Sequence, residues 1–303
     1  MKNQSAKRGR FSRRDLDGHF QGFVEHLKGK RPETRGTYER SLREFVRWFS
    51  ADGNVHFTTS DIERYKRHLT LRKKLSPVSV STYLTAVRRF CEFLVSRGIL
   101  GENPARSVGG NERPRSHSRD TLTPDEADRL LGSVETVDER GKRDMAMIRL
   151  MLGCGLSEIE IIRADIRDLR TSGGQAALLV QGKGHTVKDE LVFLPKEAYG
   201  AIQEYLDKRA SANPADPLFA SAGNRTRGER MTTRGVRDRI NACLERAGIR
   251  GIAGRRITPY SLRHTAAALL AQGGATEEEL QKRMRLGSLA TARLYLSKSL
   301  PDN

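Results

Sequence analysis

Apolar residues recur at three- and four-residue intervals over residues 15–100, which is the periodicity of amphipathic helices. Four separate runs show this spacing. Capping or first-turn residues precede three of the runs. These start signals are Pro32-Glu33-Thr34, Thr59-Ser60-Asp61 and Ser76-Pro77. The pattern predicts a compact bundle of four helices.

Gly, Pro, Ser, Asn and Arg without periodicity occupy residues 101–120, a composition typical of a linker, here a basic one. A second region opens at Thr123, which caps a helix with Pro124 in its first turn. Residues 177–180 and 191–194 predict two strands. Further helices are predicted at about 124–133, 140–154, 196–210, 232–247, 261–272, 276–284 and 288–298. The sequence therefore predicts a mainly α protein whose C-terminal domain is α+β, with one small antiparallel sheet.

Basic residues exceed acidic residues by 55 to 37, giving a formal net charge of +18. The excess lies toward the N-terminus: residues 1–119 hold 26 basic and 12 acidic residues, whereas the other 184 hold 29 and 25. Residues 1–14 carry six basic residues and no acid, which is typical of a disordered basic arm. This distribution favours a polyanion partner that the front half grips through its phosphates. A merely solvated basic surface is the alternative.

The cysteines are few and widely spaced, at Cys91, Cys154 and Cys243. Their spacing argues against a disulfide framework or a zinc cluster and fits a reducing compartment. No apolar run approaches the roughly 20 residues that a membrane span needs, and the N-terminus lacks the apolar core of a signal peptide. We therefore expect a cytoplasmic protein with no membrane partner and no bound metal.

A polar segment, residues 258–261, leads into an apolar helix, so that Arg263 lies near a predicted helix N-terminus. Backbone N–H groups favour an anion at such a place. Tyr295 follows thirty-two residues after Arg263, close to the end of the sequence. The box Arg263-His264-Thr265 and this late tyrosine are similar to those of the tyrosine recombinases, the phage integrase family. The order of bundle, basic linker and α+β region extends the resemblance over residues 15–298.

This resemblance implies a helical, SAM-like core-binding domain at 15–100, a linker at 101–120 and a catalytic domain at 121–303, which together clamp double-stranded DNA. It implies site-specific recombination or integration of DNA, as in mobile elements, through a 3′-phosphotyrosyl intermediate. Because that ester conserves the bond energy, neither ATP nor metal nor another cofactor is expected. Strand exchange also implies a homotetramer on two DNA sites, or a complex with a partner recombinase.

Three residues carry the chemistry that the resemblance implies. Tyr295 would attack the phosphate, and Arg263 would bind it through two guanidinium donors. Lys183, in the turn Gly182-Lys183-Gly184, would protonate the leaving 5′ oxygen. The alternatives are a tyrosine that only packs a helix and an ordinary exposed hairpin lysine. We expect His264 and Thr265 to support the helix start.

Three positions depart from the family pattern. Ser157 stands where the family has its first catalytic arginine, and a hydroxyl cannot replace that charge. Tyr260 takes the place of a histidine or lysine, although its phenol can still donate one hydrogen bond. Leu286 takes the place of a histidine or tryptophan and donates nothing; a shift of two residues puts Ser288 there instead.

Losing one preorganised donor around a developing oxyanion costs on the order of 3 kcal/mol, so these replacements need compensation. Arg149 and Arg163 are candidates for the missing cation if their helix faces point inward. Without a substitute, the alternative is a catalytically impaired, recombinase-like accessory subunit that binds DNA.

Sequence readout would come from groove-facing helices around 76–97 and 232–247. The basic residues expected there as phosphate or base contacts are Arg88, Arg89, Arg234 and Arg237. Periodicity does not separate base contacts from backbone contacts.

Overall fold

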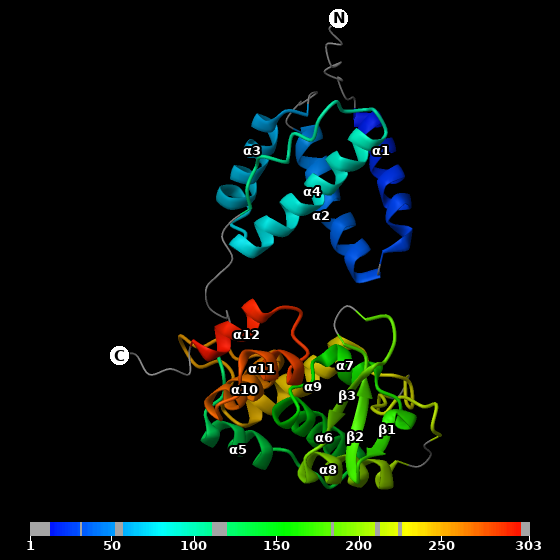
Figure 1. Cartoon of the computed structure of the whole chain (residues 1–303), viewed down its shortest axis with the longest axis vertical. Coiled ribbons are helices and arrows are strands. Elements are labelled where there is room, and N and C mark those ends of the chain that lie inside the picture. The colour runs from blue at the N-terminus through cyan, green and yellow to red at the C-terminus, as the bar shows by residue number, and fades with distance from the viewer. Residues whose placement is uncertain are drawn as a thin grey trace, which may run out of the picture. The chain divides into compact units, whose positions relative to one another are not determined.

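The computed structural model describes residues 13–30, 32–51, 57–110, 120–182, 185–209, 213–223 and 226–297. These residues form two compact units that divide at Pro114, each with its own core (Figure 1). Residues 1–12 of the predicted basic arm and all of residues 111–119 lie outside the described residues. The predicted fold class, mainly α with one small antiparallel sheet, is confirmed.

The first unit contains the four predicted helices, α1 (Arg13–His26), α2 (Pro32–Ala51), α3 (Thr59–Arg67) and α4 (Pro77–Ser96). A short 3-10 turn, η1 (Leu27–Gly29), extends α1, and a π-helical turn, η2 (His68–Arg72), extends α3. Caps fix the starts: the Thr58 N–H donates to Asp61 (3.0 Å), and the Ser79 N–H donates to the Ser76 hydroxyl (3.3 Å). Interlocking aromatic rings, Phe23, Phe45 and Phe90 among them, fill the core.

Residues 101–110, predicted as linker, pack against α4. Ala105 and Val108 are buried in the core of the first unit, and their carbonyl oxygens accept hydrogen bonds from the Arg88 guanidinium (3.3 and 3.1 Å). The Asn103 side chain donates to the Arg88 carbonyl (3.1 Å). This part of the segment is therefore ordered on the bundle.

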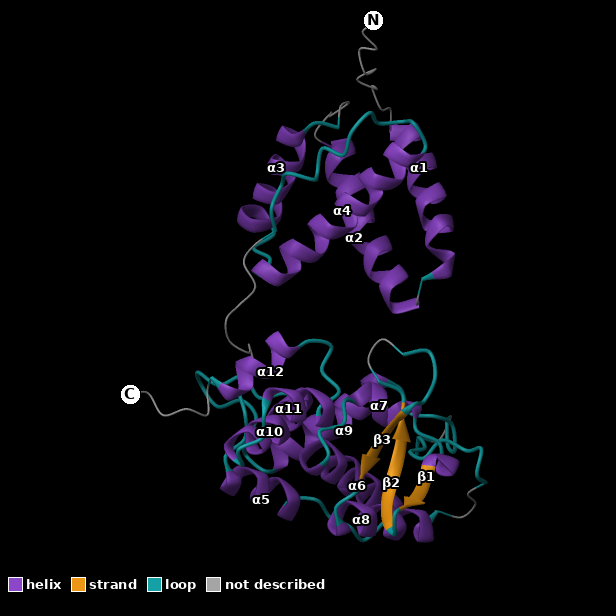
Figure 2. Ribbon diagram, in the orientation of Figure 1, coloured by secondary structure: helices purple, strands orange, loops and turns teal. Residues whose placement is uncertain are grey.

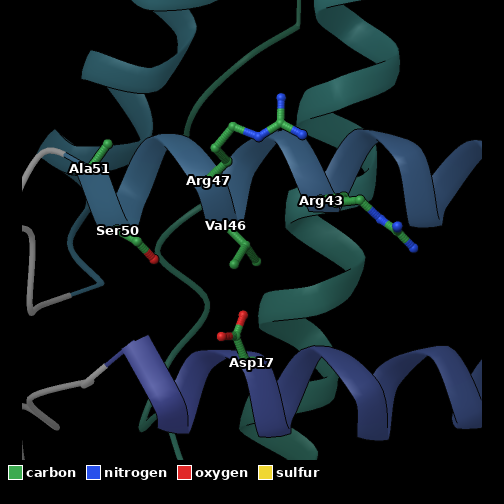
Figure 3. A pocket seen from close by; sticks show the side chains of 6 residues that line it. All are labelled: Asp17, Arg43, Val46, Arg47, Ser50 and Ala51. Carbon is green, nitrogen blue, oxygen red and sulfur yellow. The ribbon is translucent and has the colours of Figure 1, made fainter.

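A cavity of about 320 Å³ lies between α1 and α2 of the same unit (Figure 3). Asp17 of α1 faces it from one side, and α2 lines the other with the residues Arg43, Val46, Arg47, Ser50 and Ala51. None of these residues belongs to the predicted chemistry.

The second unit packs helices against a three-stranded antiparallel sheet in the order β1-β2-β3 (Figure 2). The strands are β1 (Leu169–Ser172), β2 (Gln175–Val180) and β3 (Glu190–Phe193). Leu178 of the central strand is buried and lies opposite Leu169 on one side and Val192 on the other. The prediction of two strands was one short, because β1 has only four residues and two of them are exposed.

Eight helices of the described residues complete this unit. They are α5 (Pro124–Gly132), α6 (Glu139–Gly153), α7 (Glu158–Arg163), α8 (Lys196–Lys208), α9 (Thr233–Arg246), α10 (Pro259–Gln272), α11 (Glu277–Arg283) and α12 (Leu289–Leu296), with a 3-10 turn, η3 (Ile166–Asp168), before β1. The sequence predicted all of the helices except α7, which is six residues long. Across both units, the described helices include none with the length and apolar character that a bilayer crossing requires.

Candidate active site

Arg263 lies in the second turn of α10, as the sequence predicted. The helix starts at Pro259, and the Thr258 N–H donates to the Ser261 hydroxyl (3.1 Å) across the first turn. The Arg263 side chain is buried, and its guanidinium donates to the carbonyl oxygens of Gly155 and Met284 and to Glu160 (Nη1–Oε2, 3.1 Å). Arg263 is thus held by backbone from two distant segments.

Tyr295 lies on α12, which packs beside α10. Its ring is only 5% exposed, in a small cluster with Ala266, Ala292 and Met284. The Tyr295 hydroxyl and Nδ1 of His264 are joined by a hydrogen bond of 2.6 Å. The pKa of Tyr295 is raised, chiefly because burial disfavours the phenolate; the phenol of Tyr260 adds to this, and the Arg263 charge acts in the opposite direction.

Three rings, those of Tyr260, His264 and Tyr295, form a row along α10 and α12. The Tyr260 ring meets the His264 ring edge-on, with centroids 4.9 Å apart at 71°. The His264 and Tyr295 centroids are 5.6 Å apart. His264 therefore contacts the candidate nucleophile, a contact that the sequence did not predict. Thr265 does support the helix start: its hydroxyl donates to the Ser261 carbonyl and accepts from the Leu122 N–H, both at 2.9 Å.

Ser157 is the N-cap of α7. Its hydroxyl accepts from the Glu160 N–H (3.4 Å) and donates to Glu160 Oε2 (2.8 Å), to which the Ser157 N–H also donates (2.7 Å). The pattern Ser-x-x-Glu is a capping box, and it was readable in the sequence. Ser157, at the position where the family resemblance led us to expect an arginine, thus fixes the buried carboxylate of Glu160.

That carboxylate binds a second arginine, Arg285, which sequence reasoning missed. Arg285 lies between α11 and α12 with φ of 50°, in the left-handed region that side chains rarely adopt. Its Nε donates to Glu160 Oε1 (2.5 Å), and its Nη2 donates to the Gly155 carbonyl (3.1 Å). Nη1 donates to the Arg283 carbonyl (2.7 Å). Glu160 is therefore shared by Arg263 and Arg285.

The pKa of Glu160 is lowered despite its burial. Desolvation acts to raise it, but the charges of Arg285 and then Arg263 outweigh desolvation, helped by hydrogen bonds from Arg285 and Ser157. Glu160 is thus held as a carboxylate between two guanidinium groups.

Arg149 and Arg163, the candidates for the missing cation, are half-buried on α6 and at the end of α7. The arginine that ion-pairs with Glu160 beside Arg263 is Arg285 instead, 125 residues away in sequence from its partner.

Leu286, at a departed position, is half-buried and packs against the cluster that holds Tyr295. Ser288 is the N-cap of α12, and its hydroxyl is hydrogen bonded to that of Thr291 (3.1 Å). Both residues therefore help to place the helix of the candidate nucleophile.

Lys183 and Gly184 lie outside the described residues. The residues that flank them are hydrogen bonded to each other, because the His185 N–H donates to the Gly182 carbonyl (3.1 Å). Gly182 and His185 line a cavity of about 250 Å³ together with Arg285, Leu286 and Gly287. The described residues on each side of Lys183 and Gly184 thus line the same cavity as Arg285.

Lys188, in the same β2–β3 connection, has a structural environment. Its ammonium donates to Asp165 (2.7 Å) and to Asp168, which ties the connection to η3. Desolvation acts to raise the pKa of Asp165, but hydrogen bonds from Lys188 and Arg230 lower it overall. This lysine already has two carboxylate partners and is not a candidate for proton donation.

The four arginines predicted to contact DNA have different surroundings. Arg88 is bound to backbone of its own unit, as described above. Arg89 is exposed beside Glu92 (2.9 Å), and Arg234 is 91% exposed beside Asp238 (3.7 Å). Arg237 reaches Glu158 of α7 (3.1 Å). Arg89, Arg234 and Arg237 present their guanidinium groups to solvent to a greater degree than Arg88 does.

In the parts of the chain that the structure describes, no group of three or more His, Cys, Asp or Glu side chains is placed to hold a metal ion. The candidate site is instead cationic and phenolic. A helical bundle is followed by a helical unit with one three-stranded sheet, in which Arg263 and Tyr295 lie on adjacent helices.

Comparison with known proteins identifies the family. The model of the phage integrase family matches residues 120–300, and that of the phage integrase N-terminal SAM-like domain matches residues 20–98. The chain belongs to the phage integrase family. Tyrosine recombinase XerC of Pelobacter propionicus is 31% identical over 291 residues, which cover 93% of this chain and 91% of that protein.

Two solved structures share the fold. One is the XerH site-specific recombinase bound to a palindromic difH substrate in a post-cleavage complex, with a TM-score of 0.73, 19% identity and coverage of 95% of this chain and 82% of that one. The other is the Tn1549 transposon integrase in complex with transposon right end DNA, with a TM-score of 0.71, 17% identity and coverage of 92% and 94%.

Proposed function

We propose that this protein is a site-specific DNA recombinase that exchanges strands through a phosphotyrosine at Tyr295. The observation that carries the proposal is the meeting of Tyr295 with His264, the neighbour of Arg263, across two adjacent helices. Membership of the phage integrase family and the likeness to recombinases whose structures contain DNA support the same activity.

The reaction exchanges one phosphoester for another. The Tyr295 oxygen attacks phosphorus, the bond from phosphorus to the 5′ oxygen breaks, and the strand is held as a 3′-phosphotyrosyl ester. The phenolic proton passes to Nδ1 of His264, which already lies 2.6 Å from the hydroxyl. The leaving 5′ oxygen takes a proton from Lys183. Because the phosphoester is exchanged and not hydrolysed, a 5′ hydroxyl of another strand can attack the phosphotyrosyl ester and reverse the step.

In this proposal, guanidinium groups stabilise the negative charge of the transition state. Negative charge builds on the non-bridging oxygens in the transition state, and a preorganised cation offsets it without rearranging. Arg263 is preorganised in this sense, because the Gly155 and Met284 carbonyls and Glu160 fix its orientation before DNA arrives. The Tyr260 phenol, next to His264 in the row of rings, supplies one further donor.

The two units divide the work in this proposal. The first unit and the basic residues that flank it grip the duplex through phosphates, and the second carries the chemistry. Arg89, Arg234 and Arg237 are the exposed candidates for DNA contact. Exchange between two duplexes requires four subunits, either of this chain alone or with a partner recombinase. Integration of a mobile element is the biological setting that we infer.

A nicked duplex tests the activity. A nick beside the cleavage site lets a short fragment diffuse away after attack, so the covalent intermediate accumulates. The full chain is incubated with such duplexes built on DNA that it selects from a randomised pool. We expect a denaturation-resistant protein–DNA adduct, attached at Tyr295 in peptide mapping by mass spectrometry. Tight binding without an adduct would refute the recombinase and favour the accessory DNA-binding subunit.

The role of Lys183 gives a separate prediction. We expect Lys183→Ala to slow adduct formation by roughly 10²- to 10⁴-fold, the usual contribution of a general acid. A substrate with sulfur in place of the 5′ bridging oxygen should restore most of the rate, because a thiolate leaves without a proton. Lys196→Ala, at an exposed lysine beyond β3, is the matched control. An equal loss on the oxygen and sulfur substrates would contradict proton donation by Lys183.

A further inference from the structure

A buried cluster of Arg263, Arg285 and Glu160 carries one more positive than negative charge. Both guanidinium groups ion-pair with the Glu160 carboxylate, and the side chains of all three residues are at most 6% exposed. An uncompensated charge that is removed from water is costly unless a partner is supplied. The surplus therefore favours an anion at this place.

The two guanidinium groups converge on one oxygen. Arg263 Nη1 and Arg285 Nη2 both donate to the Gly155 carbonyl, so the two nitrogens lie within two hydrogen-bond lengths of each other. Like charges at this separation repel, and an anion between them relieves the repulsion. A phosphate group suits the arrangement, because guanidinium groups bind phosphate oxygens in a forked geometry.

The position of Arg285 matches the gap left at Ser157. Arg285 donates to Gly155, two residues before Ser157, and to the carboxylate that the Ser157 hydroxyl holds. Gly155 itself has φ of 61°, and a Cβ there would come within 2.7 Å of the Met284 sulfur. A glycine at 155 thus leaves room for the Met284 side chain, which precedes Arg285.

The backbone at Arg285 also indicates a positioned side chain. The left-handed region is unfavourable for a non-glycine residue, because its Cβ approaches the backbone. Glycine follows two positions later, at 287, yet the left-handed conformation falls on the arginine. Arg285 also lines the cavity of about 250 Å³ together with Gly182 and His185, so it has a path to a ligand.

We propose that Arg285 supplies the second guanidinium for the scissile phosphate, in place of the arginine that is absent at position 157. The inference rests on the proposed function, because it assumes that the phosphate bound by Arg263 belongs to DNA. It assigns to the α11–α12 connection the charge that the family resemblance led us to expect at position 157.

Phosphate neutralisation tests this assignment without requiring cleavage. The protein carries Tyr295→Phe, and the probe is a duplex selected from a randomised pool with one methylphosphonate placed in turn at each phosphate. In the Tyr295→Phe protein that retains Arg285, we expect neutralisation of one central phosphate to weaken binding by roughly tenfold or more, as for loss of a hydrogen bond to a charged group. In Arg285→Gln, we expect that penalty to fall several-fold at the same phosphate only, with the remainder due to Arg263.

The controls separate contact with phosphate from support of the fold. Arg283→Gln removes an exposed arginine at the end of α11 and should leave the pattern unchanged. Arg285→Lys keeps a charge beside Glu160 and should give an intermediate penalty if Arg285→Gln fails to fold. The proposal would be overturned if the methylphosphonate at the central phosphate weakened binding equally with and without Arg285, in Arg285→Gln or in Arg285→Lys. It would also be overturned if the affinity loss were spread evenly over all phosphate positions. Absence of the Tyr295 adduct would count against the recombinase alone, since this binding assay uses no cleavage.

Discussion

Replacement of Tyr295 by phenylalanine is expected to abolish the covalent protein–DNA adduct and to leave DNA binding intact. The variant removes the only atom that the proposed reaction attaches to phosphorus, and loss of a nucleophile in other enzymes costs at least about 10⁴-fold. The fold should survive, because the ring still fills its apolar cluster and the loss of the hydrogen bond to His264 costs about 1 kcal/mol. Denaturing gel electrophoresis of the nicked-duplex reaction measures the adduct.

Tyr199→Phe is the matched control, since Tyr199 is a partly exposed tyrosine on α8. It should form the adduct at the unaltered rate. An adduct in Tyr295→Phe would show that another residue attacks the phosphate, whereas loss of DNA binding in the same variant would show that Tyr295 supports the binding surface. Gel shift measures the DNA affinities of the parent and of Tyr295→Phe. Equal affinities would exclude a role of the Tyr295 hydroxyl in the binding surface.

The same contacts determine how the Tyr295 phenol loses its proton during the attack. Because burial raises the pKa of Tyr295, the phenol is protonated at neutral pH and needs an acceptor as it attacks. His264 is in place for this through the 2.6 Å hydrogen bond. This explains how a buried phenol can act without being ionised beforehand.

The fold was largely predictable, because long amphipathic helices carry their periodicity and caps in the sequence. The start of α5 at Thr123-Pro124 is an example, and the structure places the helix there. The elements that were missed, α7 and β1, have six and four residues, too few to show a period. For α7 the capping box from Ser157 to Glu160 was a usable signal. It was overlooked because Ser157 was considered only as an absent arginine.

The candidate site was predictable where its residues share one motif. Arg263 and Tyr295 were found from a family resemblance, and the structure places them on adjacent helices. Arg285 had no such signal, since its partnership with Glu160 spans 125 residues and depends on a left-handed backbone. Long-range ion pairs arise from packing, which local patterns do not encode. The catalytic roles themselves stay predictions.

Replacement of Glu160 by glutamine should destabilise the second unit more than any other single change in the site. Removing one partner of a buried ion pair costs about 3–5 kcal/mol, because the charges left behind are neither solvated nor paired. The Glu160 side chain is only 4% exposed. In the variant, the guanidinium groups of Arg263 and Arg285 would face each other across a neutral amide. We expect the melting temperature to fall on the order of 10 °C. Calorimetry at neutral pH measures the difference.

The effect should depend on pH in a defined direction. The pKa of Glu160 in the folded chain lies below its ordinary value of 4.5, so its carboxylate contributes stability above that value and loses it as pH falls through the folded pKa. The gap between parent and Glu160→Gln should therefore be full at neutral pH and should shrink in acid. Glu245→Gln, at an exposed carboxylate paired with Arg250, should cost at most about 1 kcal/mol. A Glu160→Gln protein as stable as this control would contradict the charge sharing on which both arginines depend.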